Sequence, residues 1–285
     1  MTAPFRAACL QVSPGNDLAA NLAAIAELVE EAAGQGAALV ALPEFATFLD
    51  RSSQAMRGSA GADEGCAALT ALRDLARRHG ILLLVGSLVM QTDEGPEGHL
   101  ANRSFLIGPD GGVLASYDKI HLFDAVLADG RTVGESRHYR GGNVTPVVET
   151  AQGAIGMTIC YDLRFPQLYR ALALAGAEIL AIPAAFTAET GAAHWEPLLR
   201  ARAIETGCFV LAPATCGTHP GNWQTWGHAM IIDPWGRVLA SCGDELSGLC
   251  LAEIDPAACA TARSRIPSLT TNPVFDVARV TSDAT

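Results

Sequence analysis

The alternation of short apolar runs with amphipathic segments at the start of the chain restricts the fold most strongly. Residues 6–12, 37–42 and 81–85 are apolar runs of strand length. Residues 18–34 and 63–79, which separate them, carry apolar side chains at three- and four-residue spacing, as one face of a helix requires. This β-α-β-α-β order favours parallel strands with helices packed on the sheet.

The rest of the chain contains a second α/β run, which is separated from the first and followed by β segments. The strands expected in the middle are residues 101–107, 113–117, 144–149 and 155–159. Helical spacing then returns at residues 168–175 and 194–206, and strands are expected at 178–182, 209–212, 229–232, 238–240 and 248–254. Two sheets with helices outside them account for this order, so we expect an α/β fold, a four-layer α-β-β-α sandwich.

Composition and charge exclude several classes of protein. No linker, charge block or repeat divides the 285 residues, so we expect one domain over residues 1–285, with a core at about 5–256 and a tail at 257–285. Hydrophobic residues make up 49% of the chain and can bury a large core. The net charge of −11 argues against nucleic acid or an anionic membrane as partner. No apolar run is long enough to span a bilayer and no signal peptide is evident, so we expect a cytoplasmic protein.

The eight cysteines are expected to stay reduced, because the chain is long and lacks a signal peptide. No Cys-x-x-Cys or His-Glu-x-x-His spacing occurs, and we expect neither a metal nor a cofactor. A buried cysteine is usually a small apolar core residue. Cys160 differs from that pattern because it stands at the end of an apolar run and a polar turn follows it.

Three residues of complementary chemistry follow three of the expected strands. Glu44 follows the run 38–42, Lys119 follows 112–117, and Cys160 follows 154–159. Taken singly, each has an ordinary interpretation as a turn-capping carboxylate, a solvated lysine or a buried thiol. Their shared position at the carboxyl ends of strands, where α/β proteins bind ligands, instead favours a common site.

A thiol, a carboxylate and an ammonium together can perform nucleophilic catalysis. A free thiol ionises with a pKa of about 8.5, so a nucleophilic cysteine needs a base at neutral pH. Glu44 is suited to take the thiol proton and to return it to a leaving amine. Attack on a carbonyl or nitrile carbon creates negative charge, which Lys119 and the backbone N–H of Tyr161 can stabilise.

The three motifs resemble the catalytic Glu-Lys-Cys signature of the nitrilase superfamily of carbon–nitrogen hydrolases. They lie at residues 42–45, 117–124 and 158–166, in the order and spacing of that family. The resemblance covers about residues 5–256. It implies the α-β-β-α sandwich, a thioester mechanism without a cofactor, and a homodimer or a higher even-numbered homo-oligomer. It also implies that Glu135, at the position of the family's second glutamate, holds Lys119 and the attacking water.

Within the superfamily the chain is most similar to the deaminated glutathione amidases and their neighbours, the omega-amidases. Residues 186–196, 199–205 and 226–236 carry this likeness. Arg164 stands four residues after Cys160, and its planar guanidinium can bind a carboxylate through two hydrogen bonds. The resemblance implies that it holds the α-keto acid end of the substrate and that Phe186 and Thr190 line the acyl pocket. The expected substrate is therefore a small carboxylate-bearing amide.

Several alternatives remain at this stage. A family member that acts on N-carbamoyl amino acids, aliphatic amides or nitriles would share every catalytic residue, and only the shape of its pocket would differ. A papain-like hydrolase also uses a thiol, but the sequence around Cys160 lacks that family's Cys-Gly-x-Cys-Trp context. A non-catalytic binding relative is expected to have lost Glu44, Lys119 or Cys160, and all three are present.

Overall fold

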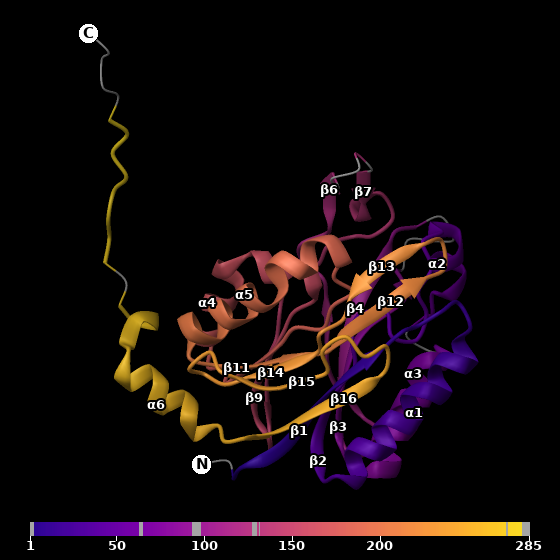
Figure 1. Ribbon diagram of the computed structural model, residues 1–285, viewed down its shortest axis with the longest axis horizontal. Coiled ribbons are helices and arrows are strands. Elements are labelled where there is room, and N and C mark those ends of the chain that lie inside the picture. The colour runs from indigo at the N-terminus through magenta and orange to yellow at the C-terminus, as the bar shows by residue number, and fades with distance from the viewer. Residues whose placement is uncertain are drawn as a thin grey trace.

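The computed structural model describes residues 3–62, 65–92, 98–126, 130, 132–271 and 273–280. Two larger sheets lie face to face, with helices packed on their outer faces (Figure 1). The expected α-β-β-α sandwich is confirmed. No helix among the described residues has the length and apolar character needed to cross a membrane.

The first sheet is built around β1 (Phe5–Val12). Its strand order is β13-β12-β1-β2-β3-β4-β5, and β16 pairs with β1 in antiparallel orientation. The strands β1, β2 and β3 are parallel to one another, as the β-α-β-α-β order predicts. The other members of this sheet are β2 (Ala37–Ala41), β3 (Leu82–Gln91), β4 (Leu100–Ile107), β5 (Val113–Asp118), β12 (Ala214–His219), β13 (Trp223–Trp226) and β16 (Gly248–Ile254).

The second sheet has the order β15-β14-β11-β10-β9-β8. Its central strands β9, β10 and β11 are parallel, and antiparallel strands flank them on both sides. A separate hairpin is formed by β6 (Asp124–Val126) and β7 (Thr132–Gly134). The strands of the second sheet are β8 (Val147–Thr150), β9 (Gly153–Met157), β10 (Ile179–Ala181), β11 (Phe209–Ala212), β14 (Met230–Ile232) and β15 (Val238–Ser241).

Helices cover the outer face of each sheet. Helices α1 and α3 lie against the first sheet, while α4 and α5 lie together over the second (Figure 1). The helices are α1 (Leu18–Gly34), α2 (Ser53–Ser59), α3 (Ala67–His79), α4 (Pro166–Leu174), α5 (Ala188–Thr206) and α6 (Ala257–Arg265). Short 3-10 turns occur at η1 (Glu135–Arg137), η2 (Cys160–Arg164) and η3 (Pro267–Leu269).

The strand β1 shows why its sequence is apolar almost throughout. Ala7 and Cys9 contribute to the core between the two sheets, whereas Ala8 and Leu10 contribute to the core under α1 and α3. All four are fully buried. A strand that is covered on both faces needs apolar residues at successive positions instead of alternating ones.

The structure differs from the sequence-based elements in several places. Helix α5 begins at Ala188, six residues before the expected start, and the segment after residue 256 contains α6 and η3 where a tail was expected. Cys259 and Leu269 of these elements are buried in the hydrophobic cluster that the second sheet shares with α4 and α5. The expected start of the second helix at Asp63 lies outside the described residues. The short α2, β6 and β7 were not expected, because segments this short give no clear period.

Gly86 in β3 allows a close approach to the segments that follow β2 and β10. A Cβ atom at this position would lie 2.2 Å from the carbonyl oxygen of Leu42 and 2.2 Å from Cβ of Pro183. Pro183 in turn accepts a 2.8 Å hydrogen bond from the backbone N–H of Cys160. The missing side chain of Gly86 therefore determines how closely the segments carrying Glu44 and Cys160 can approach.

We expect Gly86→Ala to lower the free energy of unfolding by at least about 2 kcal/mol, because backbone atoms must shift to admit the methyl group. Gly34→Ala is the matched control: its Cβ would meet nothing within 4 Å, and the change should be neutral or slightly stabilising. Urea unfolding of both variants tests this. Equal stability of the two would show that the approach at Gly86 tolerates a side chain.

Candidate active site

The three strand-end residues meet in one buried place. Glu44 lies just after β2, Lys119 follows β5, and Cys160 begins η2 shortly after β9. Glu44 and Lys119 are 2% exposed and Cys160 is 9% exposed. Together with Glu135 they line a cavity of about 490 Å³, which lies within the usual size range of small-molecule sites.

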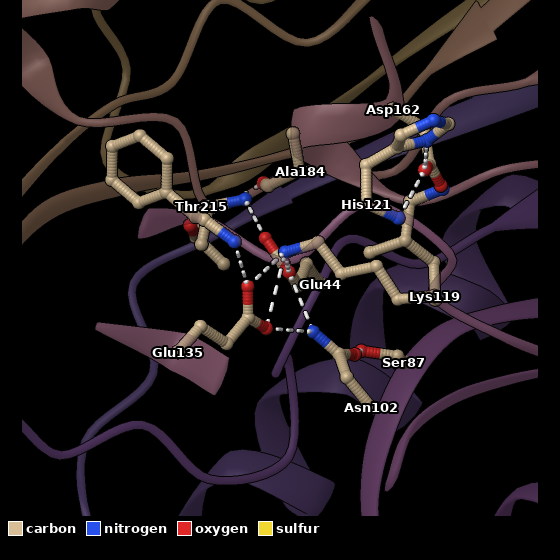
Figure 2. A network of polar contacts seen from close by, with 12 residues as sticks. Glu44, Ser87, Asn102, Lys119, His121, Glu135, Asp162, Ala184 and Thr215 are labelled. Carbon is tan, nitrogen blue, oxygen red and sulfur yellow. Dashed lines mark hydrogen bonds and ion pairs between the residues drawn. The ribbon is translucent and has the colours of Figure 1, made fainter. Parts of the chain in front are cut away.

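Lys119 lies between the two glutamates. Its Nζ atom is 3.0 Å from Oε1 of Glu44, and 2.9 Å and 3.2 Å from the two carboxylate oxygens of Glu135 (Figure 2). Burial alone would lower the pKa of Lys119, but the charges of Glu135 and Glu44 outweigh it and hold the pKa well above its ordinary value. The ammonium is therefore charged at neutral pH.

Neutral donors complete the coordination of both carboxylates. Glu44 accepts a 2.8 Å hydrogen bond from the N–H of Ala185, and Glu135 accepts one of 2.7 Å from the N–H of Phe123. The side-chain amide of Asn102 donates to both, at 2.8 Å to Glu44 and 3.1 Å to Glu135 (Figure 2). These donors offset the excess of one negative charge that two carboxylates and one ammonium leave.

Cys160 is held in an unusual backbone conformation. Its φ angle is +48°, a left-handed conformation that a residue with a Cβ atom rarely adopts. Its N–H is bound by the Pro183 carbonyl, and its thiol lies beside Glu44. Burial and the charge of Glu44 raise the pKa of the thiol well above its ordinary value, although Lys119 partly opposes this. The resting cysteine is therefore a neutral thiol that needs a base.

The arrangement supplies such a base and a place for developing charge. Glu44 is the acceptor next to the thiol, so proton transfer to Glu44 can accompany attack by the sulfur atom. Lys119 has three N–H donors, and a charge that develops close to Cys160 would be stabilised by this fixed ammonium. The N–H of Tyr161 lies in the first turn of η2, directly after Cys160, and its role as an oxyanion donor remains a prediction.

The expected substrate-binding residues lie elsewhere. Arg164, Phe186 and Thr190 are not among the described residues that line the cavity. The guanidinium of Arg164 lies 5.1 Å from the centre of the Phe186 ring, and its Nη1 atom is 3.3 Å from Nδ1 of His194. Phe186 is buried against Trp195, and Oγ1 of Thr190 is 2.8 Å from Oγ1 of Thr187. Their roles in substrate binding remain predictions.

Sequence reasoning missed several residues of the site. Asn102 bridges the two carboxylates, and Arg51 and Arg137 bring positive charge to the lining of the cavity. A signal for Asn102 existed: it is an amide within the otherwise largely apolar run of β4, where it is 1% exposed. A polar side chain buried in a strand requires partners, and here the partners are the carboxylates of Glu44 and Glu135. Arg51 lies in an irregular segment and Arg137 ends the short turn η1, and neither gave such a signal.

Metal ligation has no support among the residues with defined positions. No group of three or more His, Cys, Asp or Glu side chains within that part of the chain is arranged to hold a metal ion. Glu44 and Glu135 are bound instead by Lys119, Asn102 and backbone donors.

Comparison with known proteins agrees with this site. The sequence profile described as carbon-nitrogen hydrolase matches residues 6–264. The chain belongs to the carbon-nitrogen hydrolase family. It is therefore a hydrolase that acts on carbon–nitrogen bonds other than peptide bonds, and the thioester mechanism is general for this family.

Individual relatives give the same result. The deaminated glutathione amidase of Synechocystis is 43% identical over 272 residues, which cover 93% of this chain and 97% of the relative. The crystal structure of the Caenorhabditis elegans NitFhit protein has a TM-score of 0.88 at 36% identity, covering 95% of this chain and 65% of that longer one. Saccharomyces cerevisiae Nit3, of the nitrilase superfamily, has a TM-score of 0.85 at 28% identity, covering 95% and 97%.

We expect Glu44→Gln to lower kcat by at least about 100-fold with little change in KM, because the amide keeps the shape of the side chain and removes the base. Glu44→Asp keeps the carboxylate but draws it back by one methylene, so it should retain more activity than Glu44→Gln. Steady-state kinetics of the two variants measure this. A loss confined to KM would show that Glu44 binds substrate and does not transfer a proton.

Proposed function

We propose that this chain is an amidase that hydrolyses the amide bond of a small carboxylate-bearing substrate through a thioester on Cys160. The substrate class is deaminated glutathione or an omega-amide of an α-keto acid. One observation carries the proposal: a buried thiol beside Glu44 and Lys119 opens into a substrate-sized cavity. The name of the Synechocystis relative supports the choice of substrate.

Acylation begins with attack by Sγ of Cys160 on the amide carbon while Glu44 takes the thiol proton. The oxyanion of the tetrahedral intermediate is stabilised by Nζ of Lys119 and the N–H of Tyr161. When the carbon–nitrogen bond breaks, Glu44 returns the proton to the leaving nitrogen. The products of this half-reaction are an amine or ammonia and the thioester.

Deacylation uses the same groups with water in place of the amine. Glu44 takes a proton from a water molecule held with the help of Glu135, and the oxygen attacks the thioester carbon. Collapse of the second intermediate breaks the carbon–sulfur bond, and the proton on Glu44 returns to sulfur. Glu135 suits this task because Lys119, Asn102 and the N–H of Phe123 fix its orientation.

The size of the cavity favours the larger of the two substrate candidates. A volume of about 490 Å³ is typical of sites for drug-sized ligands and exceeds what a short primary amide needs. Deaminated glutathione is a peptide-sized amide with a carboxylate at each end. We therefore favour it over an omega-amide such as α-ketoglutaramate.

The test of the proposed function is a comparison of substrates. We expect kcat/KM to be highest for deaminated glutathione, lower for α-ketoglutaramate, and at least about 100-fold lower for an N-carbamoyl amino acid, butyramide or a nitrile. Amine or ammonia release measures this. Intact-mass spectrometry with a slow amide should detect an acyl adduct that Cys160→Ala lacks. Highest activity on an N-carbamoyl compound, simple amide or nitrile would identify one of the other family activities, and no turnover of any of them would favour a binding relative.

Either Arg164, or Arg51 together with Arg137, can account for recognition of a substrate carboxylate. Arg164 is our first proposal, through the bidentate geometry of its guanidinium. Arg51 and Arg137 form the second set, because they line the cavity. Phe186 and Thr190 are proposed to shape the acyl side of the site.

We expect Arg164→Lys to lower kcat/KM for a carboxylate substrate by roughly 10- to 100-fold and to leave hydrolysis of butyramide nearly unchanged. Arg51→Gln in the same assay tests the second set. A selective loss only in Arg51→Gln would assign carboxylate recognition to the cavity lining. Equal losses on both substrates in Arg164→Lys would mean that Arg164 braces the Cys160 turn.

We also propose that the chain forms one domain and assembles as an even-numbered homo-oligomer built on a twofold dimer. The core between the sheets draws residues from both, which supports one domain. Helices α4 and α5 expose Leu174 and Ile204, which are 58% and 56% accessible. Light scattering should return about twice the 29.7 kDa chain mass, or an even multiple of it. A mass of one chain at micromolar concentration would contradict the assembly.

We also propose that the protein is cytoplasmic. We propose that it uses no cofactor and has no macromolecular partner other than further copies of the chain. All eight cysteines are free, which a reducing compartment maintains. Fractionation of cells that express a tagged chain tests the location, and recovery in the membrane or periplasmic fraction would contradict it.

A further inference from the structure

Asp162 is a buried carboxylate that the reaction itself does not use. It is fully buried and accepts four hydrogen bonds. Oδ2 accepts from the hydroxyl of Tyr117 at 2.7 Å and from the N–H of Ile159 at 2.8 Å. Oδ1 accepts from the N–H of His121 at 3.1 Å and lies 2.7 Å from its ring Nδ1 (Figure 2). Two carboxylate oxygens offer about four acceptor positions, so the group is fully used.

The donors come from the two segments that carry the catalytic residues. Tyr117 and His121 lie on either side of Lys119, and Ile159 directly precedes Cys160. The Tyr117 hydroxyl also accepts a 3.0 Å hydrogen bond from the N–H of Ile120. The carboxylate of Asp162 therefore connects, through hydrogen bonds, the turn that carries Cys160 with the loop that carries Lys119.

Both segments need hydrogen bonds of this kind to hold their backbone conformation. The left-handed conformation of Cys160 persists only where the surroundings hold it, and Asp162 binds the N–H of the preceding residue. The backbone of Lys119 is bound on its other side, by the carbonyl of Asn102 and the N–H of Gly142. Asp162 therefore supplies the contacts that orient residues 120 and 121 relative to η2.

We propose that Asp162 is a positioning residue that sets the placement of Lys119 relative to the Cys160 sulfur, acting through Tyr117 and His121. It touches neither the substrate nor the reacting atoms. The proposal rests on the proposed role of Cys160 as nucleophile. Asparagine cannot replace Asp162, because its NH₂ group would face donors where the carboxylate accepts.

A pair of tyrosines offers a matched test. Tyr117 and Tyr169 are both buried, and the hydroxyl of each is hydrogen-bonded to a residue two positions from Cys160, Asp162 for Tyr117 and Thr158 for Tyr169. The hydroxyl of Tyr169 pairs with Oγ1 of Thr158 at 3.0 Å, and among the described residues it has no hydrogen bond to the Lys119 segment. Replacing either by phenylalanine removes one buried hydroxyl. Tyr117→Phe also removes the acceptor of the Ile120 N–H, so it should lose at least as much thermal stability as Tyr169→Phe, and the comparison therefore depends on the chemistry of Cys160.

The variants should differ in the chemistry of Cys160. We expect Tyr117→Phe to lower kcat by at least about 10-fold, with KM within about 2-fold, and Tyr169→Phe to leave both within about 2-fold of the native enzyme. The rate of alkylation of Cys160 by iodoacetamide, followed by peptide mass, should fall in parallel in Tyr117→Phe, because a displaced Lys119 stabilises the thiolate less.

Asp162→Asn completes the test. It should lower kcat and the alkylation rate at least as much as Tyr117→Phe, and the double variant should be no worse than Asp162→Asn alone within about 2-fold, because both act through one contact. If Asp162→Asn does not fold, the comparison of Tyr117→Phe with Tyr169→Phe still tests the proposal. Equal effects of Tyr117→Phe and Tyr169→Phe would overturn the proposal. Alkylation needs no substrate, so this outcome is distinct from failure of the proposed function, which native turnover and Cys160→Ala report.

Discussion

The ion pairs of Lys119 with Glu44 and Glu135 are the interaction on which the rest of the site depends. An ammonium that is 2% exposed is costly to bury, and two carboxylates at about 3 Å outweigh that cost. The second carboxylate leaves an excess negative charge, which Asn102 and the N–H groups of Ala185 and Phe123 stabilise. Glu44, Lys119 and Asn102 lie on or just after strands of the first sheet, whereas Ala185 follows β10 of the second. The complete set of contacts therefore forms only when both sheets are in place.

The same charges determine how the nucleophile can work. Glu44 and burial keep Cys160 as a thiol, so this site does not store a thiolate at rest. In the proposed mechanism, reactivity arises instead when the proton moves to Glu44 in the transition state, at which point Lys119 stabilises the charge that appears. A catalytic group that is neutral at rest avoids the cost of a further buried negative charge beside two carboxylates.

The fold supports this arrangement through close contacts. Gly86 admits Leu42 and Pro183 to within a distance that no side chain would permit, and Pro183 holds the strained backbone of Cys160. Arg202 binds the carbonyl of Leu163 at the other end of η2 with two N–H groups, at 2.7 and 3.0 Å. The nucleophile turn is thus fixed from both ends by the two-sheet core and by α5.

The sequence by itself determined the layers, the family and three residues of the site. Apolar runs of strand length and helical spacing are local patterns, and so are the three motifs that carry Glu44, Lys119 and Cys160. Glu135 followed from the resemblance, and the structure places it on Lys119. Short elements such as α2 and the β6–β7 hairpin were not predicted, because they contain too few residues to show a period.

Only the tertiary structure decided which side chains share the cavity. Arg164 is close to Cys160 in sequence, yet its guanidinium lies over Phe186 and outside the described lining, while Arg51 and Arg137 reach the cavity from remote segments. The side chain of Asn102 bonds to Glu44 and Glu135, which are at least 33 positions away, and to the nearer Ser87. The side chain of Asp162 bonds to Tyr117 and His121, which are at least 41 positions away, and to the nearby Ile159. Such pairings depend on strand order and register, which bring distant segments together and leave no periodic trace in the sequence.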